Sequence, residues 1–239
     1  MKRERGVTLL ELLISISLVS LLSLGVMYSL RVGIDALGKV NDRFMKNRRV
    51  LGAEKALAQM LHGMMPATVE CGNQPGGPKS VMFQGDPQAM RFVSSYSLNE
   101  GARGYPKLVE FTVIPGEKEG FRMIVNEVPY SSTLSLRGLC VGISNDPSTG
   151  QPSPLFPPVG PRPDSFILAD RLAGVQFFYR ETLPAPLFER WHTKWLYSKM
   201  PSAVRIQMLP LEQTPANLQT SSVTIPIRIT ANPLYAHTD

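Results

Sequence analysis

The pattern of apolar and polar positions changes twice along the chain, and its first part is a long apolar run near the start. From Val7 to Leu30 the sequence holds 24 residues in which Glu11 is the only ionisable group apart from Tyr28. As an α-helix this run is about 36 Å long, slightly more than the roughly 30 Å hydrocarbon core of a bilayer. Residues 7–30 therefore predict a transmembrane helix.

A basic leader, residues 1–6, precedes this run and contains Lys2, Arg3 and Arg5. Because Lys and Arg beside a membrane span resist translocation, we expect the leader in the cytoplasm and the rest of the chain on the far side. A secretory signal peptide is disfavoured, since its apolar core has about 7 to 15 residues and precedes a small-x-small cleavage site. Ser23-Leu24-Gly25 is a poor match to such a site.

The pattern becomes amphipathic in residues 31–65. Apolar residues recur there at three, four or seven positions, as one face of a helix requires; they are Leu37, Val40, Phe44, Leu51, Ala58, Leu61 and Met65. We therefore predict a single helix from about Thr8 to about Met65, roughly 85 Å long. Its second half is expected to pack on the domain that follows, and Pro66 is expected to end it.

From Cys71 onward the pattern changes to short β-branched and aromatic runs separated by Gly, Pro and Asn, which is typical of strands. The expected strands are Ser80 to Gln84, Arg91 to Tyr96, Leu108 to Ile114, Phe121 to Val128, Leu134 to Ile143, Phe166 to Ala169, Val175 to Tyr179, Val204 to Leu209 and Val223 to Ile229. Residues 66–239 thus predict an antiparallel sheet domain. The expected fold class is α+β, with the long helix packed on this sheet.

Two details of the sheet domain follow from residue type. Residues 145–164 contain seven prolines and two glycines, so we expect a surface loop that donates no ladder hydrogen bonds. Near the C-terminus apolar and polar residues alternate as the two faces of a sheet require. The expected core residues are Phe177, Tyr179, Val204, Ile206, Ile225 and Ile227, and the expected outward ones are Gln176, Arg205, Arg228 and Thr230.

Composition excludes some classes of protein. With 43% hydrophobic residues the chain can bury a core, which excludes a wholly disordered protein. The 25 Lys and Arg exceed the 19 Asp and Glu by six, but the excess is spread too evenly over the body to predict nucleic-acid binding. Two cysteines and three histidines are too few for a zinc site built from those residues alone, so no metal is expected.

The two cysteines, Cys71 and Cys140, both lie outside the cytoplasm in the expected topology. A disulfide can form there and would add up to about 4 kcal/mol of stability in the chain-entropy model. Two separate buried thiols remain the alternative, because the sequence does not give the distance between them.

Glu11 is the most informative residue of the apolar run. A carboxylate inside a membrane span costs a few kcal/mol near the bilayer centre, less towards its ends, and usually marks a functional partner. A positive group is therefore expected beside it. The alternative is an acid at the helix end that reaches the membrane interface.

The residues around Glu11 resemble a known signal. Arg5-Gly6-Val7-Thr8-Leu9-Leu10-Glu11 is similar to the type IV prepilin signal, which pilins share with the pseudopilins of type II secretion. The resemblance implies that a membrane peptidase cuts between Gly6 and Val7 and methylates the new N-terminus. Val7 stands where the family usually has phenylalanine. A freed α-amine is largely cationic at neutral pH, so it can pair with Glu11 of a neighbouring subunit during assembly.

A second resemblance lies near the C-terminus. Residues 172–180, then Trp191 and Trp195, then residues 200–206 look like the corresponding half of the J-type minor pseudopilins, with Met200 where leucine is usual and an insert at 183–187. This resemblance implies a pseudopilin fold in the bacterial inner membrane, with the head in the periplasm. The implied partners are the I-type and K-type minor pseudopilins, the major pseudopilin, the prepilin peptidase and the inner-membrane assembly platform.

No arrangement typical of an enzyme stands out, so neither catalysis nor a cofactor is expected. His62, His192 and His237 have no spaced partner, and Pro75-Gly76-Gly77-Pro78 indicates a turn rather than a phosphate loop. Trp191, His192, Trp195 and Tyr197 are expected to form a hydrophobic cluster under a loop, with a sugar- or peptide-stacking site as the alternative. Two other functions stay open: a minor pilin of a type IV pilus or competence system, and a membrane-tethered periplasmic enzyme or binding module.

Overall fold

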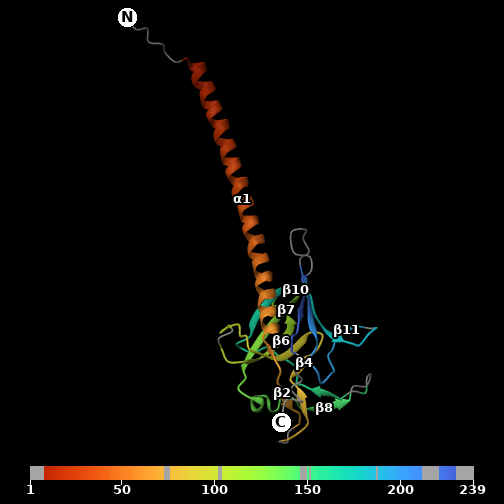
Figure 1. The fold of residues 1–239 in the computed structure, drawn as a ribbon. Coiled ribbons are helices and arrows are strands. Elements are labelled where there is room, and N and C mark those ends of the chain that lie inside the picture. Colours follow the sequence, from red (N-terminus) through yellow and green to blue (C-terminus); the bar gives the residue numbers. More distant parts are fainter. Residues whose placement is uncertain are drawn as a thin grey trace. The chain divides into compact units, whose positions relative to one another are not determined.

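The structure is a computed structural model (Figure 1), and it describes residues 8–72, 76–101, 104–145, 150, 152–186, 188–211 and 221–229. For residues 41–51 and for Ser221 the backbone alone is described. The chain divides into two compact units, residues 1–48 and residues 49–239. The second unit is called the head below.

The first element is one long helix, α1, Leu9–His62, as the sequence predicts. It ends three residues before the expected Met65, and Pro66 is not what stops it. The Gly63 N–H still donates to the Gln59 carbonyl at 2.9 Å, and then the Gly63 carbonyl accepts from the Ser95 N–H at 2.8 Å. A Cβ on Gly63 would lie 2.9 Å from the Ser94 Oγ, so this close turn from helix to sheet needs glycine.

The head is built on a nine-stranded antiparallel sheet with the order β1-β5-β6-β7-β10-β12-β13, to which β4 and β11 add at β5 and β10. Its strands are β1 Met64–Met65, β4 Phe83–Gly85, β5 Ala89–Ser94, β6 Lys107–Pro115, β7 Phe121–Pro129, β10 Phe166–Thr182, β11 Glu189–His192, β12 Ala203–Pro210 and β13 Ser221–Pro226. Two small hairpins pair β2 Thr68–Glu70 with β3 Lys79–Val81, and β8 Gly142–Asn145 with β9 Pro152–Leu155. The α+β fold class is confirmed.

Several strand predictions are wrong in detail. Residues 134–143 are not one strand, because a short 3-10 helix, η1 Thr133–Leu136, and a turn with Gly138 at φ 82° precede β8. Residues 80–84 divide between β3 and β4. Residues 166–169 and 175–179 belong to the single strand β10, which absorbs three register shifts. Residues 223–229 end as a strand at Pro226.

The proline-rich stretch 145–164 is only partly a loop. Pro152–Leu155 forms β9 and pairs with β8, with Asn145 opposite Pro152 and Ile143 opposite Pro154. Proline is compatible with a strand whose N–H groups face away from the partner, as on the edge of a two-stranded hairpin. The expectation that the whole stretch is excluded from ladders is therefore wrong.

The sheet of the head carries an apolar layer on each face. The larger layer packs the last turns of α1, with Leu57, Met60 and Leu61 fully buried, against the inner side chains of the strands. All six core residues expected near the C-terminus are buried in it. Gln176 and Arg228 are exposed and Arg205 is half-buried, as expected, and Thr230 lies outside the described residues.

The apolar stripe of the helix is displaced from the predicted one. Within the head Ala53, Leu57, Met60 and Leu61 are buried, while Ala58 is only half-buried. The expected stripe residues Leu37 and Val40 belong to the other unit, where they are 71% and 60% exposed. The side chains of Phe44 and Leu51 lie outside the described part.

Candidate functional site: the N-terminal helix and its carboxylate

The start of α1 is fixed by a side-chain cap. Thr8 precedes the helix, and its Oγ1 accepts a hydrogen bond from the Glu11 N–H at 3.3 Å. Glu11 is thus the third residue of the helix, as in the Ser/Thr-x-x-Glu capping signal. Sequence analysis overlooked this signal, although Thr8 and Glu11 show it. The acid is also favourable here because it lies at the positive end of the helix dipole.

The carboxylate of Glu11 stands out from the other polar groups nearby. The hydroxyl of Ser15 donates to the Glu11 carbonyl at 2.7 Å, and the hydroxyl of Ser17 donates to the Ile14 carbonyl at 2.8 Å. The helix therefore satisfies these hydroxyls by itself. Within the part of the chain that the structure describes, the Glu11 carboxylate has neither a hydrogen bond nor an ion pair.

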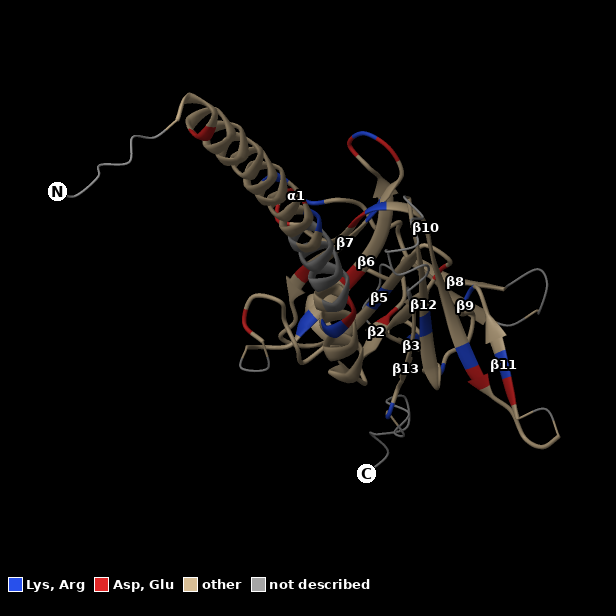
Figure 2. Cartoon of the chain, turned by 90° about the horizontal axis from the view of Figure 1, so that it is seen from above, with Lys and Arg blue, Asp and Glu red and all other residues tan. Residues whose placement is uncertain are grey.

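The helix around Glu11 presents apolar side chains on every side. Residues Leu9–Val40 form a stretch of 32 residues that is long and apolar enough to cross a membrane, and its side chains are exposed. Figure 2 shows one acidic position near the N-terminal end of α1 in an otherwise uncharged stretch. A helix that is apolar all round and exposed fits a single-pass membrane anchor.

Gly6 and Val7, the expected cleavage and methylation positions, lie outside the described residues, as does the rest of the leader. The sequence there is matched by a family model. Residues 1–27 match the prokaryotic N-terminal methylation motif. No curated protein matches the chain. The motif and the apolar helix behind it indicate a type IV pilin-like protein.

The head contains a buried row of polar residues that sequence analysis missed. Arg91, Glu110 and Asn126 lie opposite one another on β5, β6 and β7. Arg91 Nε donates to Glu110 Oε1 at 2.8 Å, and Asn126 Nδ2 donates to Glu110 Oε2 at 3.2 Å. Burial lowers the pKa of Arg91, and the charge of Glu110 opposes this effect. Their in-register spacing is visible only once the strand pairing is known.

This row is covered by the proline-rich stretch. The Pro157 carbonyl accepts from Arg91 Nη1 at 3.3 Å, and the Gly160 carbonyl accepts from Asn126 Nδ2 at 2.9 Å. Arg162 Nη2 lies 3.0 Å from Glu110 Oε2. The second half of the stretch is therefore a strap that is fastened to the sheet by buried polar side chains.

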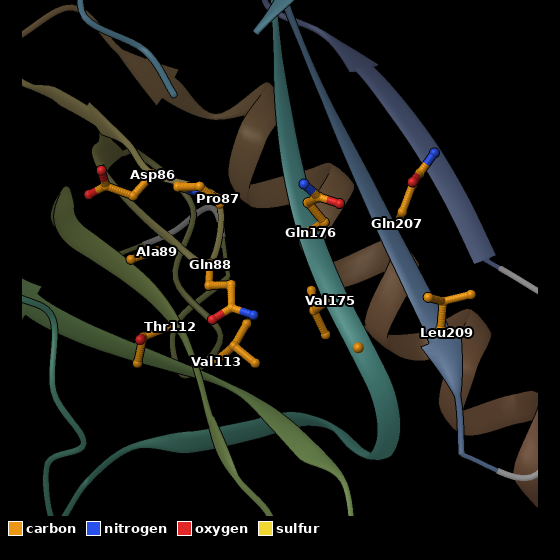
Figure 3. Close-up of a pocket in the computed structure, with 11 residues that line it drawn as sticks. Asp86, Pro87, Gln88, Ala89, Thr112, Val113, Val175, Gln176, Gln207 and Leu209 are labelled. Carbon is orange, nitrogen blue, oxygen red and sulfur yellow. The ribbon is translucent and has the colours of Figure 1, made fainter. Parts of the chain in front are cut away.

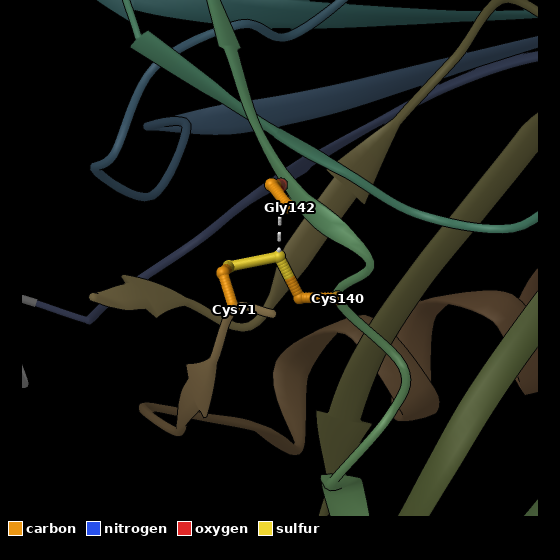
Figure 4. The surroundings of a disulfide bond; sticks show 3 residues. All are labelled: Cys71, Cys140 and Gly142. Carbon is orange, nitrogen blue, oxygen red and sulfur yellow. Dashed lines mark hydrogen bonds between the residues drawn. A yellow bond between two sulfur atoms is a disulfide. The ribbon is translucent and has the colours of Figure 1, made fainter. Parts of the chain in front are cut away.

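The structure contains a disulfide between Cys71 and Cys140, the pairing that the sequence left open (Figure 4). Both residues are buried in the smaller apolar layer, together with Val93, Leu108 and Leu136. The Gly72 N–H donates to the Cys140 carbonyl at 3.0 Å beside the bond. The disulfide thus ties the β2–β3 hairpin to the segment between η1 and β8.

The aromatic residues after β10 divide between two places. Trp195 is buried against Tyr179 and contacts the rings of His192 and Tyr197. Trp191 is not part of this cluster, since it lies under the guanidinium of Arg205 at 4.0 Å. The prediction that all four residues form one cluster is therefore wrong, because Trp191 lies outside it.

Beside this cluster lies a buried carboxylate. Glu181 accepts from Lys199 Nζ at 2.8 Å, and its other oxygen lies 3.0 Å from His192 Nε2. Burial raises the pKa of Glu181, but the hydrogen bonds from Lys199 and His192 outweigh this effect and leave the pKa lowered.

The other candidates from the sequence are placed as follows. His62 is exposed at the end of α1, and His237 lies outside the described residues. Gly76 has a φ of 82°, in keeping with a turn, while Pro75 is not described. Among the described residues no three His, Cys, Asp or Glu side chains lie close enough to hold a metal ion.

Proposed function

We propose that the chain is a minor pseudopilin of the J type in a type II secretion system. It is pulled from the inner membrane into a short periplasmic filament, where it joins the I-type and K-type minor pseudopilins and the major pseudopilin. Together the minor subunits cap and prime the filament and so support protein export. The role needs no catalysis and no cofactor. The type II assignment rests on the resemblance of residues 172–180 and 200–206 to the J-type subunits.

The observation that carries the proposal is the Glu11 carboxylate, which is three residues into an exposed apolar helix and has no partner among the described residues. In a bilayer such a group is costly unless a cation meets it. Under the proposal the peptidase cuts between Gly6 and Val7, and the methylated amine of Val7 stays cationic. When helices stack in parallel, the amine of one subunit pairs with Glu11 of the next.

Glu11→Val tests this assembly step. We expect the variant to be lost or sharply reduced in filaments while its membrane-inserted pool stays intact, measured by fractionating sheared filaments from membranes. Ser17→Val is the matched control, because it removes a polar group from the same span whose hydroxyl is satisfied within the helix. If Glu11→Val enters filaments as well as Ser17→Val does, the helix is a passive anchor and the tethered enzyme or binding module becomes the better interpretation.

A minor pilin of a type IV pilus or competence system shares every N-terminal feature of the proposal. The two differ in the machine that the subunit joins. Mass spectrometry of partners that copurify with the membrane-extracted protein distinguishes them. Secretion-system pseudopilins support the proposal, and pilus or competence subunits replace it with this alternative.

A further inference from the structure

One face of the head, over β10, β11 and β12, carries an arginine that is held in place and has no acidic partner among the described residues. Arg205 of β12 extends its guanidinium across β10 to Trp191 of β11, with Cζ 4.0 Å from the centroid of the indole. Its Nε donates to the Thr224 hydroxyl of β13 at 3.2 Å. The ring contact and this hydrogen bond fix the orientation of the guanidinium. The terminal nitrogens Nη1 and Nη2 have no hydrogen-bond partner in the described part of the chain.

Other arginines on the strands of the head differ from Arg205 in this respect. Each has a carboxylate oxygen at 3.3 Å or less, and the pairs are Arg91 with Glu110, Arg122 with Asp170 and Arg180 with Glu189. The described residues supply no such carboxylate to Arg205. A guanidinium only donates hydrogen bonds, and its planar pair of terminal nitrogens matches the two oxygens of a carboxylate.

Trp191 places a further free donor beside this guanidinium. Its indole N–H has no acceptor among the described residues, whereas the indole N–H of Trp195 donates to the Lys199 carbonyl at 2.7 Å. The free groups of Trp191 and Arg205 are therefore all donors. They match a ligand group that only accepts, as an ionised carboxylate does.

The charge on this face indicates which anion fits. Alternation along the paired strands places Arg180, Glu189 and Arg205 on the same face as Trp191. Arg180 is paired with Glu189, with Nη1 3.3 Å from Oε2. Among these residues the single positive charge of Arg205 is left without compensation. It matches one carboxylate better than it matches a doubly charged phosphate.

The same face continues to a pair of carboxamides. Gln176 and Gln207 lie directly opposite each other on β10 and β12, one step along the face from Arg205 (Figure 3). Gln176 is exposed and Gln207 is half-buried. Neither carboxamide has a hydrogen-bond partner within the described part of the head. Since a carboxamide both donates and accepts, as a peptide group does, the pair matches the main chain beside an acidic residue.

We propose that this face binds an acidic segment of another protein, with one Asp or Glu carboxylate on the guanidinium of Arg205. Trp191 and Thr224 hold the guanidinium for it, and Gln176 and Gln207 bind the neighbouring peptide groups of the segment. Because the central contact joins two charged groups near the surface, binding weakens as the salt concentration rises. The interaction goes beyond helix-mediated assembly and does not depend on the secretion-system assignment.

Peptide binding to the full chain in detergent micelles gives the first test. A random phage-displayed library of linear peptides is depleted on Arg205→Gln and then selected on the wild-type chain. We expect the binders to contain Asp or Glu, and their Kd to rise about tenfold or more when that acid is replaced by its amide. A selection without binders, or binders that need no acid, would overturn the proposal.

A matched charge variant shows whether the effect belongs to this face. Arg137→Gln removes the same charge from an exposed arginine that follows η1. We expect the selected peptides to bind Arg137→Gln as they bind wild type, and Arg205→Gln about tenfold or more weakly. Equal weakening by the two variants would contradict the proposal, because it would reflect only the net charge of the chain.

The indole N–H signals in the NMR spectrum of the wild-type chain give a test that does not depend on how Arg205→Gln folds. The chain has two tryptophans, and Trp191→Phe assigns their two signals. We expect the bound peptide to shift the signal of Trp191, whose N–H is free. A complex in which this signal does not move would overturn the proposal.

Competition distinguishes a carboxylate site from a phosphate site. Acetate and inorganic phosphate are added to the peptide complex at equal ionic strength. We expect phosphate to displace the peptide no better than acetate does. If phosphate displaces it at a lower concentration, the face is a phosphate site and the proposal of an acidic segment is wrong.

Discussion

Single carboxylates in this protein differ in what surrounds them. Among the described residues, Glu11 has only the helix cap and the apolar face of α1 around it, whereas Glu110 and Glu181 are buried among cations in the head. A buried carboxylate that loses its cation is costly, and so is a buried cation that loses its carboxylate. Removing either buried acid of the head would therefore leave a cation without its partner, whereas the external partner of Glu11 belongs to the proposed assembly step.

Removing Glu110 tests the buried row. Glu110→Ala leaves Arg91 buried without its charge partner, and we expect the free energy of unfolding to fall by about 3 to 5 kcal/mol. Glu100→Ala is the control, because Glu100 pairs with Lys107 at the surface, where such pairs contribute about 0 to 1 kcal/mol. Urea unfolding measures both. If the free energy of unfolding falls by similar amounts in the two variants, the buried polar row does not stabilise the sheet.

Glu181 makes stability depend on pH. Its pKa is lowered in the folded head, so its contribution is present above the usual carboxyl value of 4.5 and is lost as pH falls through the lowered value. We expect the free energy of unfolding, measured with urea, to fall less on acidification for Glu181→Gln than for wild type. Glu189→Gln, which removes the charge of a carboxyl on β11 that is 53% exposed, is the control for the loss of one negative charge. If the free energy of unfolding of Glu181→Gln depends on pH as strongly as that of wild type, Glu181 does not have this role.

At the scale of elements, the spacing of apolar residues predicts those helices and strands that the local sequence determines. The long helix and the alternating core of β10, β12 and β13 follow from the spacing of apolar residues, because each has a wide apolar face. The element boundaries that the sequence predicts wrongly involve contacts between residues far apart in the chain. The helix ends where the Ser95 N–H donates to the Gly63 carbonyl, and residues 134–143 turn at Gly138 and lead to Cys140, which is bonded to Cys71. No local pattern encodes either partner.

The candidate site likewise divides into features that are local in sequence and features that depend on strand pairing. The apolar helix around Glu11 is local in sequence and is predicted from it, while the role of Glu11 in assembly stays a prediction. The cap by Thr8 was equally visible there but was overlooked. The polar row under the proline-rich strap joins residues on three strands, so it required the observed register.

The disulfide links elements that are far apart in the chain. It closes a separation of 69 residues, for which the chain-entropy model gives about 4 kcal/mol. We expect reductant to lower the free energy of unfolding of the wild-type chain by about this amount. The double variant Cys71→Ala, Cys140→Ala should start at the lower value and not respond to reductant. A wild-type chain that is equally stable with and without reductant would contradict the structural role of the bond.

At the scale of the whole molecule, the chain has an apolar N-terminal helix that fits a single-pass membrane anchor, followed by a β-sheet head. Along the described strands of the head, acidic and basic positions are interspersed (Figure 2). The feature that sets this protein apart from an ordinary anchored domain is the start of its chain, where a methylation motif contains an acid within an apolar helix.

The most direct test of this account is the intact mass of the protein extracted from membranes of a host that has the prepilin peptidase. We predict a chain that begins at Val7 and carries one added methyl group. A membrane-extracted chain that still begins at Met1 in that host would contradict the prediction.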